Sequence, residues 1–100
     1  MSGPAANPER IARMRALLEA AFDPVALEVI DDSHKHVGHA GARDGRGHFT
    51  VAIVSDAFAE KPPLARHRAV YSALGAMMED DIHALSIRAQ TPTERDASAT

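Results

Sequence analysis

Hydrophobic residues in the N-terminal quarter of the chain recur every three or four positions, which is the spacing of an amphipathic helix. The residues on this apolar face are Ile11, Met14, Leu17, Leu18, Ala21 and Phe22. Asn7 can cap the first turn, and Pro8 fits there because the first turn does not need its N–H. Asp23 and Pro24 then end the helical pattern. The pattern predicts a helix over residues 7–22.

Three further segments have the pattern of β-strands. Residues 26–31 form a short segment that contains Leu27, Val29 and Ile30. Residues 48–55 are β-branched and apolar on both faces, as in a central strand. Residues 82–90 alternate between apolar and polar, so one face of this strand is exposed to water. We expect the first two strands to pair as a hairpin whose tip is the long loop 32–47.

A second helical segment follows two consecutive prolines and covers residues 64–80. The order helix, strand, strand, helix, strand predicts an α+β fold with two helices on one face of a three-stranded sheet. Residues 1–6 and 92–100 are small and polar. We therefore expect a disordered N-terminus and a flexible C-terminal tail on either side of a single domain at residues 7–91.

The composition of the 100 residues excludes several function classes. Hydrophobic residues make up 45% and charged residues 25%, as in an ordinary globular domain, and the net charge of −3 argues against strong non-specific binding to nucleic acid. The absence of cysteine excludes disulfides and a metal site built from the chain's own thiolates. No apolar run is long enough to cross a bilayer and no secretory signal is visible, so we expect a cytoplasmic protein with no membrane partner.

The common motifs of catalysis are also missing from the sequence. The serines do not lie in a nucleophile elbow, and the glycines match neither a dinucleotide-binding loop nor a P-loop. We therefore expect a binding protein and not an enzyme. The remaining candidates for a functional site are the six histidines of the chain. Histidine is the commonest metal ligand among the side chains.

Four of the histidines fall within residues 31–49: His34, His36, His39 and His48. His34 and His36 point to the same side if this segment is extended, and His39 could join them. These three are therefore either candidate metal ligands or side chains of a solvated loop. His48 opens a strand, where a histidine bonded to the backbone is the simpler interpretation.

His83 stands at the start of the last strand and has the same parity as the inward-facing Leu85 and Ile87. An imidazole at such a boundary can be half covered, with one nitrogen held by a backbone group and the other exposed, as in many ligand histidines. Parity alone favours a histidine at the edge of the core, and metal ligation is the alternative.

A single basic cluster is visible in the sequence and comprises Lys61, Arg66, His67 and Arg68. It is either a solvated first turn of the second helix or a docking patch for an acidic partner or for phosphates. Any nucleic-acid binding would depend on these few cations, so we expect it to be weak at physiological salt.

Several ordered segments resemble the BolA family and extend together from about residue 11 to residue 94: AFDPVALEVIDDSHKHVGHAG, HFTVAIVSDAF, RHRAVYSAL and IHALSIRAQTPTE. One departure is visible at Glu60, where family members commonly have glycine. The resemblance implies an α-β-β-α-β core, often with an extra short helical turn before the second long helix. It also implies a topology akin to one type of KH nucleic-acid-binding domain.

A partner and a cofactor are implied by the same resemblance. Members of this family pair with monothiol glutaredoxins, and the heterodimer holds a 2Fe–2S cluster with ligands from the glutaredoxin cysteine, a glutathione thiol and histidine of the BolA chain. The family's C-terminal ligand falls on His83 and its loop ligand on His36, with His34 and His39 as rivals for the loop position. The isolated chain is then expected to hold no cluster and to be a monomer or a weak homodimer.

Such a partnership would explain a histidine-rich chain without cysteine. In Rieske centres two imidazoles replace two thiolates on one iron, so a partner's thiolates can complete a cluster. The leading hypothesis is an adaptor in iron–sulfur cluster trafficking or in iron and redox regulation. The alternatives are a transcriptional regulator that binds nucleic acid through the KH-like fold, and a simple histidine site for zinc or copper with modest affinity.

Overall fold

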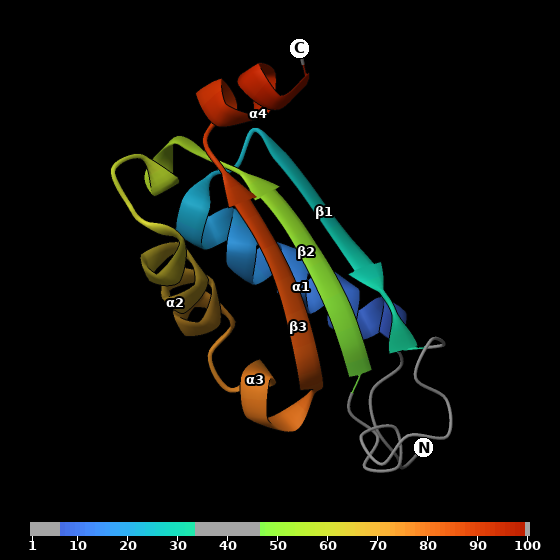
Figure 1. Cartoon of the computed structure of the whole chain (residues 1–100). Coiled ribbons are helices and arrows are strands. Elements are labelled where there is room, and N and C mark those ends of the chain that lie inside the picture. Colours follow the sequence, from blue (N-terminus) through green and yellow to red (C-terminus); the bar gives the residue numbers. More distant parts are fainter. Residues whose placement is uncertain (1–6, 34–46, 100) are drawn as a thin grey trace.

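The computed structural model describes residues 7–33 and 47–99 and divides them among helices and strands. In chain order these are α1 (Asn7–Phe22), β1 (Ala26–Asp31), β2 (Gly47–Val54), the 3₁₀ turn η3 (Asp56–Phe58), α2 (Pro63–Leu74), α3 (Met77–Asp80), β3 (Ile82–Gln90) and α4 (Pro92–Ala99). The three strands form one sheet, and α1 and α2 lie behind it in the view of Figure 1. No described helix crosses the front of the sheet (Figure 1). The predicted α+β fold is confirmed, including the short turn before the second long helix.

The central strand, β2, pairs with its two neighbours in opposite senses. It runs antiparallel to β1, with Val51 opposite Val29, and parallel to β3, with Val51 opposite Ile87. A parallel neighbour requires a crossover connection, which η3, α2 and α3 provide. Because parallel strands begin at the same end of a sheet, the first residues of β2 and β3 lie side by side.

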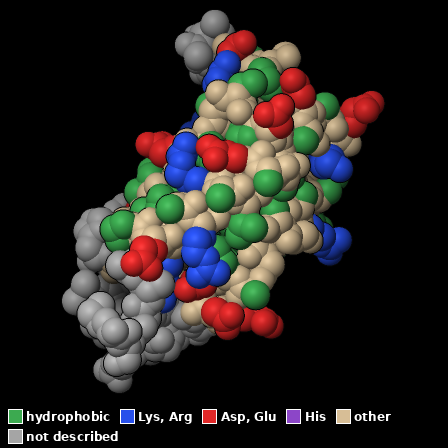
Figure 2. Space-filling view, turned by 180° about the vertical axis from the view of Figure 1, so that it is seen from behind, with side chains coloured by type: hydrophobic (Ala, Val, Ile, Leu, Met, Phe, Trp, Pro, Cys, Tyr) green, Lys and Arg blue, Asp and Glu red, His purple; other side chains and the backbone are tan. Residues whose placement is uncertain are grey.

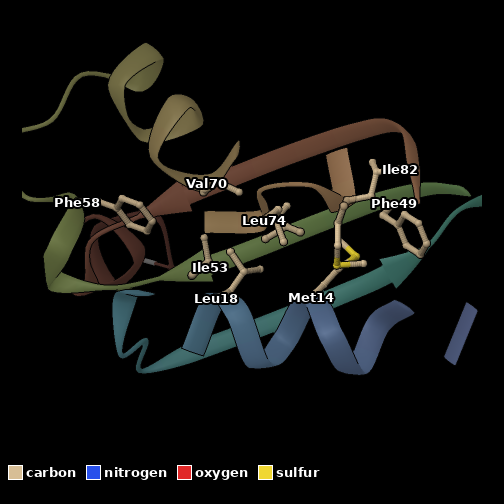
Figure 3. Packing of buried hydrophobic residues seen from close by; sticks show 10 residues of the cluster. Met14, Leu18, Phe49, Ile53, Phe58, Val70, Leu74 and Ile82 are labelled. Atoms are coloured by element: carbon tan, nitrogen blue, oxygen red, sulfur yellow. The ribbon is translucent and has the colours of Figure 1, made fainter. Parts of the chain in front are cut away.

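The hydrophobic core fills the space between the sheet and the two long helices (Figure 3). Its buried members are Met14, Leu18, Phe49, Val51, Ile53, Phe58, Val70, Leu74, Met77 and Ile82. Fewer side chains of α1 are buried in the core than its apolar pattern predicted. Met14 and Leu18 are fully buried, whereas Leu17 is 38% exposed because it lies beside the buried stripe.

The helix predicted over residues 64–80 is interrupted in the structure at Gly75. Gly75 has a φ of 57°, and its N–H donates to the carbonyl of Tyr71, 3.0 Å away. Glycine adopts positive φ at little cost, so α2 ends here and the short α3 follows.

A second difference lies at the C-terminal end, where residues that we expected in a flexible tail form α4. The N–H of Thr91 donates to Oε1 of Glu94 at 3.0 Å, and the N–H of Glu94 donates to Oγ1 of Thr91 at 3.2 Å. This reciprocal pair is a capping box, and Pro92 fits the first turn that it opens. The predicted disordered N-terminus, residues 1–6, lies outside the described residues.

Each edge strand has a backbone carbonyl that an arginine of a helix covers. Arg15 of α1 donates to the carbonyl of Leu27 on β1, and Arg66 of α2 donates to the carbonyl of Ala89 on β3, both at 3.0 Å. Covered groups of this kind leave fewer sites where a foreign strand can pair. Within the described ranges, every helix is too short or too polar to span a membrane.

Candidate metal-ligand site

An irregularity at the start of β3 changes the direction of its side chains. Gly47 of β2 is opposite Ile82, but the next residue, His48, is opposite Ala84. One extra residue of β3, His83, is therefore inserted into the ladder at this point. Bulges of this type bend a strand and re-aim side chains.

The bulge overturns the predicted environment of His83. We expected its side chain to share the inward parity of Leu85 and Ile87, but His83 is exposed. Ile82 takes the buried position instead, at 1% exposure. The prediction of an inward-facing, half-covered His83 was wrong because the extra residue breaks the alternation of the strand.

The ring of His48 lies against the ring of His83. Their centroids are 5.0 Å apart and their planes are inclined by 47°. His48 is half-buried on the helix-free face of β2, where Thr50 follows it two residues later. The sequence pattern alone predicts no contact between these two histidines. A signal was nevertheless present, since each of them opens a strand, and adjacent parallel strands open at the same end.

The start of β2 is tied to the end of β1 around His48. The backbone N–H of His48 donates to Oγ of Ser33 at 3.0 Å, and its carbonyl accepts from the N–H of Asp32 at 2.8 Å. The hydroxyl of Thr50 donates to the carboxylate of Asp32. These bonds hold the N–H and the carbonyl of His48 to the end of β1.

The predicted loop ligands His34, His36 and His39 lie outside the described residues. The residues that flank this segment, Ser33 and Gly47, are described, and both lie at the end of the sheet where β3 begins. The histidine-rich segment is thus joined to the fold beside His83 at both of its ends. The choice of His36 over its two rivals stays a prediction.

A buried ion pair holds Asp81, the residue directly before β3. Nε of Arg10 lies 3.1 Å from Oδ1 of Asp81, and their side chains are 4% and 10% exposed. A second arginine of α1, Arg13, reaches the other carboxylate oxygen at 3.6 Å. The backbone carbonyl of Asp81 also accepts from the N–H of Gly47 at 2.9 Å. The start of β3 is therefore anchored to both α1 and β2.

The described residues alone do not make a closed metal site. In residues 7–33 and 47–99, no three His, Asp or Glu side chains are grouped to hold a metal ion. The geometry instead offers the exposed imidazole of His83, with a second imidazole at its side. A metal centre that uses His83 needs further ligands.

Comparison with known proteins identifies the fold and the family together. The family model of BolA-like proteins matches residues 18–94, and that range includes both His48 and His83. The chain belongs to the BolA family. One BolA-family relative, SufE-like protein 1, chloroplastic/mitochondrial, of Arabidopsis thaliana, is 48% identical over 87 residues, which are 82% of this chain and 24% of that protein. This chain therefore spans about a quarter of that relative's length.

A bacterial BolA relative matches over more of its own length. DNA-binding transcriptional regulator BolA of Escherichia coli (strain K12) is 42% identical over 82 residues, which are 82% of this chain and 75% of that protein. Among solved structures, the BolA domain of SufE1 from Arabidopsis thaliana superposes with a TM-score of 0.77 at 48% identity. That match covers 85% of this chain and 94% of the solved one. The similarity to a KH domain, implied by the resemblance, stays a prediction.

In this BolA-family chain, Arg66 of the basic cluster is engaged within the fold. Its Nε donates to the carbonyl of Lys61 at 2.7 Å. Its two terminal nitrogens donate to the carboxylate of Glu94 at 2.6 and 2.9 Å, and one of them also reaches Ala89. The hydrogen bonds from Arg66 and from Thr91 hold the pKa of Glu94 at about 2, below its ordinary value.

A docking role for the basic cluster stays a prediction, and its four members differ in how far they are engaged within the fold. The bonds of Arg66 argue against a role in docking, because its guanidinium already has acceptors on three sides. Lys61 and Arg68 are exposed, and His67 is half-buried. On the helix-bearing surface, charged side chains of both signs are interspersed (Figure 2), so no basic field dominates that view.

The departure from the BolA family at Glu60 falls on an unusual backbone conformation. Glu60 has a φ of 65°, in the left-handed region that glycine adopts at least cost. Glycine, which the family resemblance leads us to expect at this turn, has no Cβ and adopts this φ without strain. Glu60 therefore holds a strained turn between η3 and α2.

Proposed function

We propose that this BolA-family chain is an adaptor that supplies imidazole ligands to a 2Fe–2S cluster shared with a monothiol glutaredoxin. The observation that carries the proposal is the exposed His83 on a bulge, beside both attachment points of a histidine-rich segment. A partner can approach His83 because it is exposed, and the buried Asp81, which directly precedes β3, anchors the start of the strand.

The donor set of the chain fits this role. Clusters of this type are usually held by thiolates, which this chain lacks, but imidazoles can replace two of them on one iron. His83 and His36, with His34 and His39 as rivals, would bind one iron. The glutaredoxin cysteine and glutathione would supply the thiolates. When bound, the cluster supplies one-electron chemistry and is itself the cargo for trafficking or the signal for iron and redox regulation.

An adaptor of this type is a binding protein and not an enzyme. On its own it would be a monomer or a weak homodimer without a cluster, and we propose the cytoplasm as its location. The isolated chain should lose all colour after reconstitution with iron and sulfide followed by gel filtration. A brown protein in the eluted peak would contradict the shared-ligand proposal.

The decisive experiment adds this chain to a cluster-loaded monothiol glutaredoxin with glutathione and records visible absorption and circular dichroism. We expect a new spectrum for the natural chain, no new spectrum for His83→Ala, and a weakened or altered one for His36→Ala. His67→Ala is the matched control for ligation, since it removes a histidine from α2 and should give the spectrum of the natural chain. A loss of the spectrum for His67→Ala would point to docking through the basic cluster instead. Far-UV circular dichroism checks that each variant folds. An unchanged spectrum for His83→Ala would sink the proposal.

The second candidate function is transcriptional regulation through DNA binding, and the name of the Escherichia coli relative favours it. The exposed Lys61 and Arg68 could contact phosphates, but the net charge of −3 and the internal bonds of Arg66 count against strong binding. We expect weak binding that decreases steeply with added salt, measured by fluorescence anisotropy with duplex DNA. Nanomolar, sequence-specific binding at physiological salt would make regulation the better proposal.

A further inference from the structure

The two histidines at the start of the parallel strands differ in how firmly they are held. His48 is on the central strand, is half-buried, and has both its backbone N–H and its carbonyl bonded, to Ser33 and Asp32. His83 is on an edge strand, at a bulge, and is exposed. An exposed side chain at a bulge has several rotamers open to it, and binding to a metal would have to select one of them at a cost in entropy.

The contact between the two rings limits that freedom. With centroids 5.0 Å apart and planes inclined by 47°, the rings are in the range in which aromatic side chains attract one another. The half-buried ring of His48, on a strand whose backbone is bonded at this residue, therefore forms one wall for the ring of His83. The rotamers of His83 that keep this contact are favoured over those that turn the ring fully into solvent.

We propose that His48 is a positioning residue for His83, which pre-orients the exposed imidazole before a partner arrives. What His83 then binds depends on the proposed function, whereas the contact itself belongs to the chain alone. His48 reduces the conformational entropy that the side chain of His83 loses when it binds a metal, as preorganised sites do. This role is distinct from that of a ligand, because an aromatic ring without nitrogen could fill it.

Exposure favours positioning over ligation for His48. A shared metal centre needs a ligand atom that the partner's side of the centre can approach, and the exposed residue of the pair is His83. His48 lies further in, next to the strand pairing with Ser33 and Asp32. In this proposal His83 binds the shared centre, and His48 lies behind it and orients its ring.

The test compares His48→Phe with His48→Ala. Phenylalanine keeps a ring against His83 but has no nitrogen, and alanine removes the ring. Cluster capture from loaded glutaredoxin, followed by visible circular dichroism, should be close to natural for His48→Phe and about threefold to tenfold weaker for His48→Ala. Equal losses for both variants would overturn the proposal, because they would show that the nitrogen of His48 is needed. Natural capture by His48→Ala would overturn it as well.

A second measurement uses the isolated chain and needs no cluster. Nuclear Overhauser effects between ring protons of His48 and His83 should be visible in the natural protein. The ring-proton resonances of His83 should stay dispersed in His48→Phe and move toward random-coil positions in His48→Ala. Absence of the contact in the natural protein would overturn the positioning role, even if neither variant folds. Absence of any mixed cluster for the natural chain would overturn the proposed function only, and the resonance data would still decide on positioning.

Discussion

At one end of the β2–β3 pair a histidine side chain is exposed at the surface, and at the opposite end polar groups bond to one another within the fold. β3 begins with a bulge that exposes His83 beside His48. β3 ends at Gln90, whose carbonyl accepts from the N–H of Ser55. The hydroxyl of Ser55 in turn donates to the carbonyl of Phe22 at 2.6 Å. We call the end with His48 and His83 the histidine end, and the end with Ser55 and Gln90 the closed end.

The arginines at the two ends are both engaged within the fold, but they differ in depth. At the closed end, Arg66 binds Glu94 and two carbonyls and so ties α2 to α4. At the histidine end, Arg10 and Asp81 are buried below the strand, so their charges anchor the backbone without occupying the surface. A polar residue near a sheet terminus is therefore a poor guide to function until its partners are known. The predictions below test whether the two ends can be perturbed separately.

The largest effect should come from the core of the closed end. Phe58 is fully buried, and its ring centroid lies 5.0 Å from that of Phe22. Phe58→Ala should lower the free energy of unfolding by about 3–5 kcal/mol, because it leaves a large cavity. Urea denaturation measures the loss. The control Leu64→Ala removes a large side chain that is 61% exposed and should change stability by about 0.5 kcal/mol or less. Similar losses for both would contradict the assigned core.

A smaller effect, confined to the histidine end, is expected for Gly47→Ala. A Cβ at this position would lie 2.6 Å from Cε2 of the buried Phe49 and 3.0 Å from Oγ of Ser33. The shift that this forces should cost about 1–3 kcal/mol and should move the ring-proton resonances of His83.

The contrasting variant for that test is Gly75→Ala. Its new Cβ meets nothing nearer than 3.9 Å, although the φ of 57° remains strained for alanine. It should cost about 1 kcal/mol and leave the resonances of His83 in place. If the two variants disturb His83 equally, the histidine end is not a separate unit.

A gain in stability is expected at the strained turn that leads away from the closed end. Glu60→Gly should raise the free energy of unfolding by up to about 1 kcal/mol, because glycine tolerates the positive φ of this residue. Glu60→Ala is the control, since it removes the carboxylate but retains Cβ, and it should give no comparable gain. Thermal unfolding followed by circular dichroism compares the three proteins, and a gain for alanine equal to that for glycine would exclude relief of strain.

The smallest effect concerns the ion pair of the closed end and depends on pH. Because the pKa of Glu94 is lowered to about 2 from 4.5, its contribution to stability should be complete above pH 4.5 and lost as the pH falls through about 2. The difference in stability between the natural protein and Glu94→Gln should accordingly shrink with falling pH. It should be modest throughout, since the pair is partly exposed. Denaturation curves across this range provide the measurement, and a difference that grows on acidification would contradict the assignment.

The elements with strong local patterns were predictable from the sequence alone. The helix α1 follows from apolar residues at helical spacing, and β2 follows from its β-branched run. The capping box of Thr91 and Glu94 was also present in the sequence, but the small polar residues after it suggested a tail and hid the helix. In each of these cases the information lies within one segment, so inspection of that segment can find it.

Only the tertiary structure decided the character of the candidate site. Parity placed His83 inward, yet a single extra residue in the β3 ladder turned it outward, and a bulge depends on the neighbouring strand. The contact between His48 and His83 depends on the parallel register of two strands that are far apart in the sequence. The engagement of Arg66 depends on Glu94 of α4, which lies far from the basic cluster in the sequence. Local periodicity reports which residues form an element, whereas register and long-range contacts determine what each exposed side chain can reach.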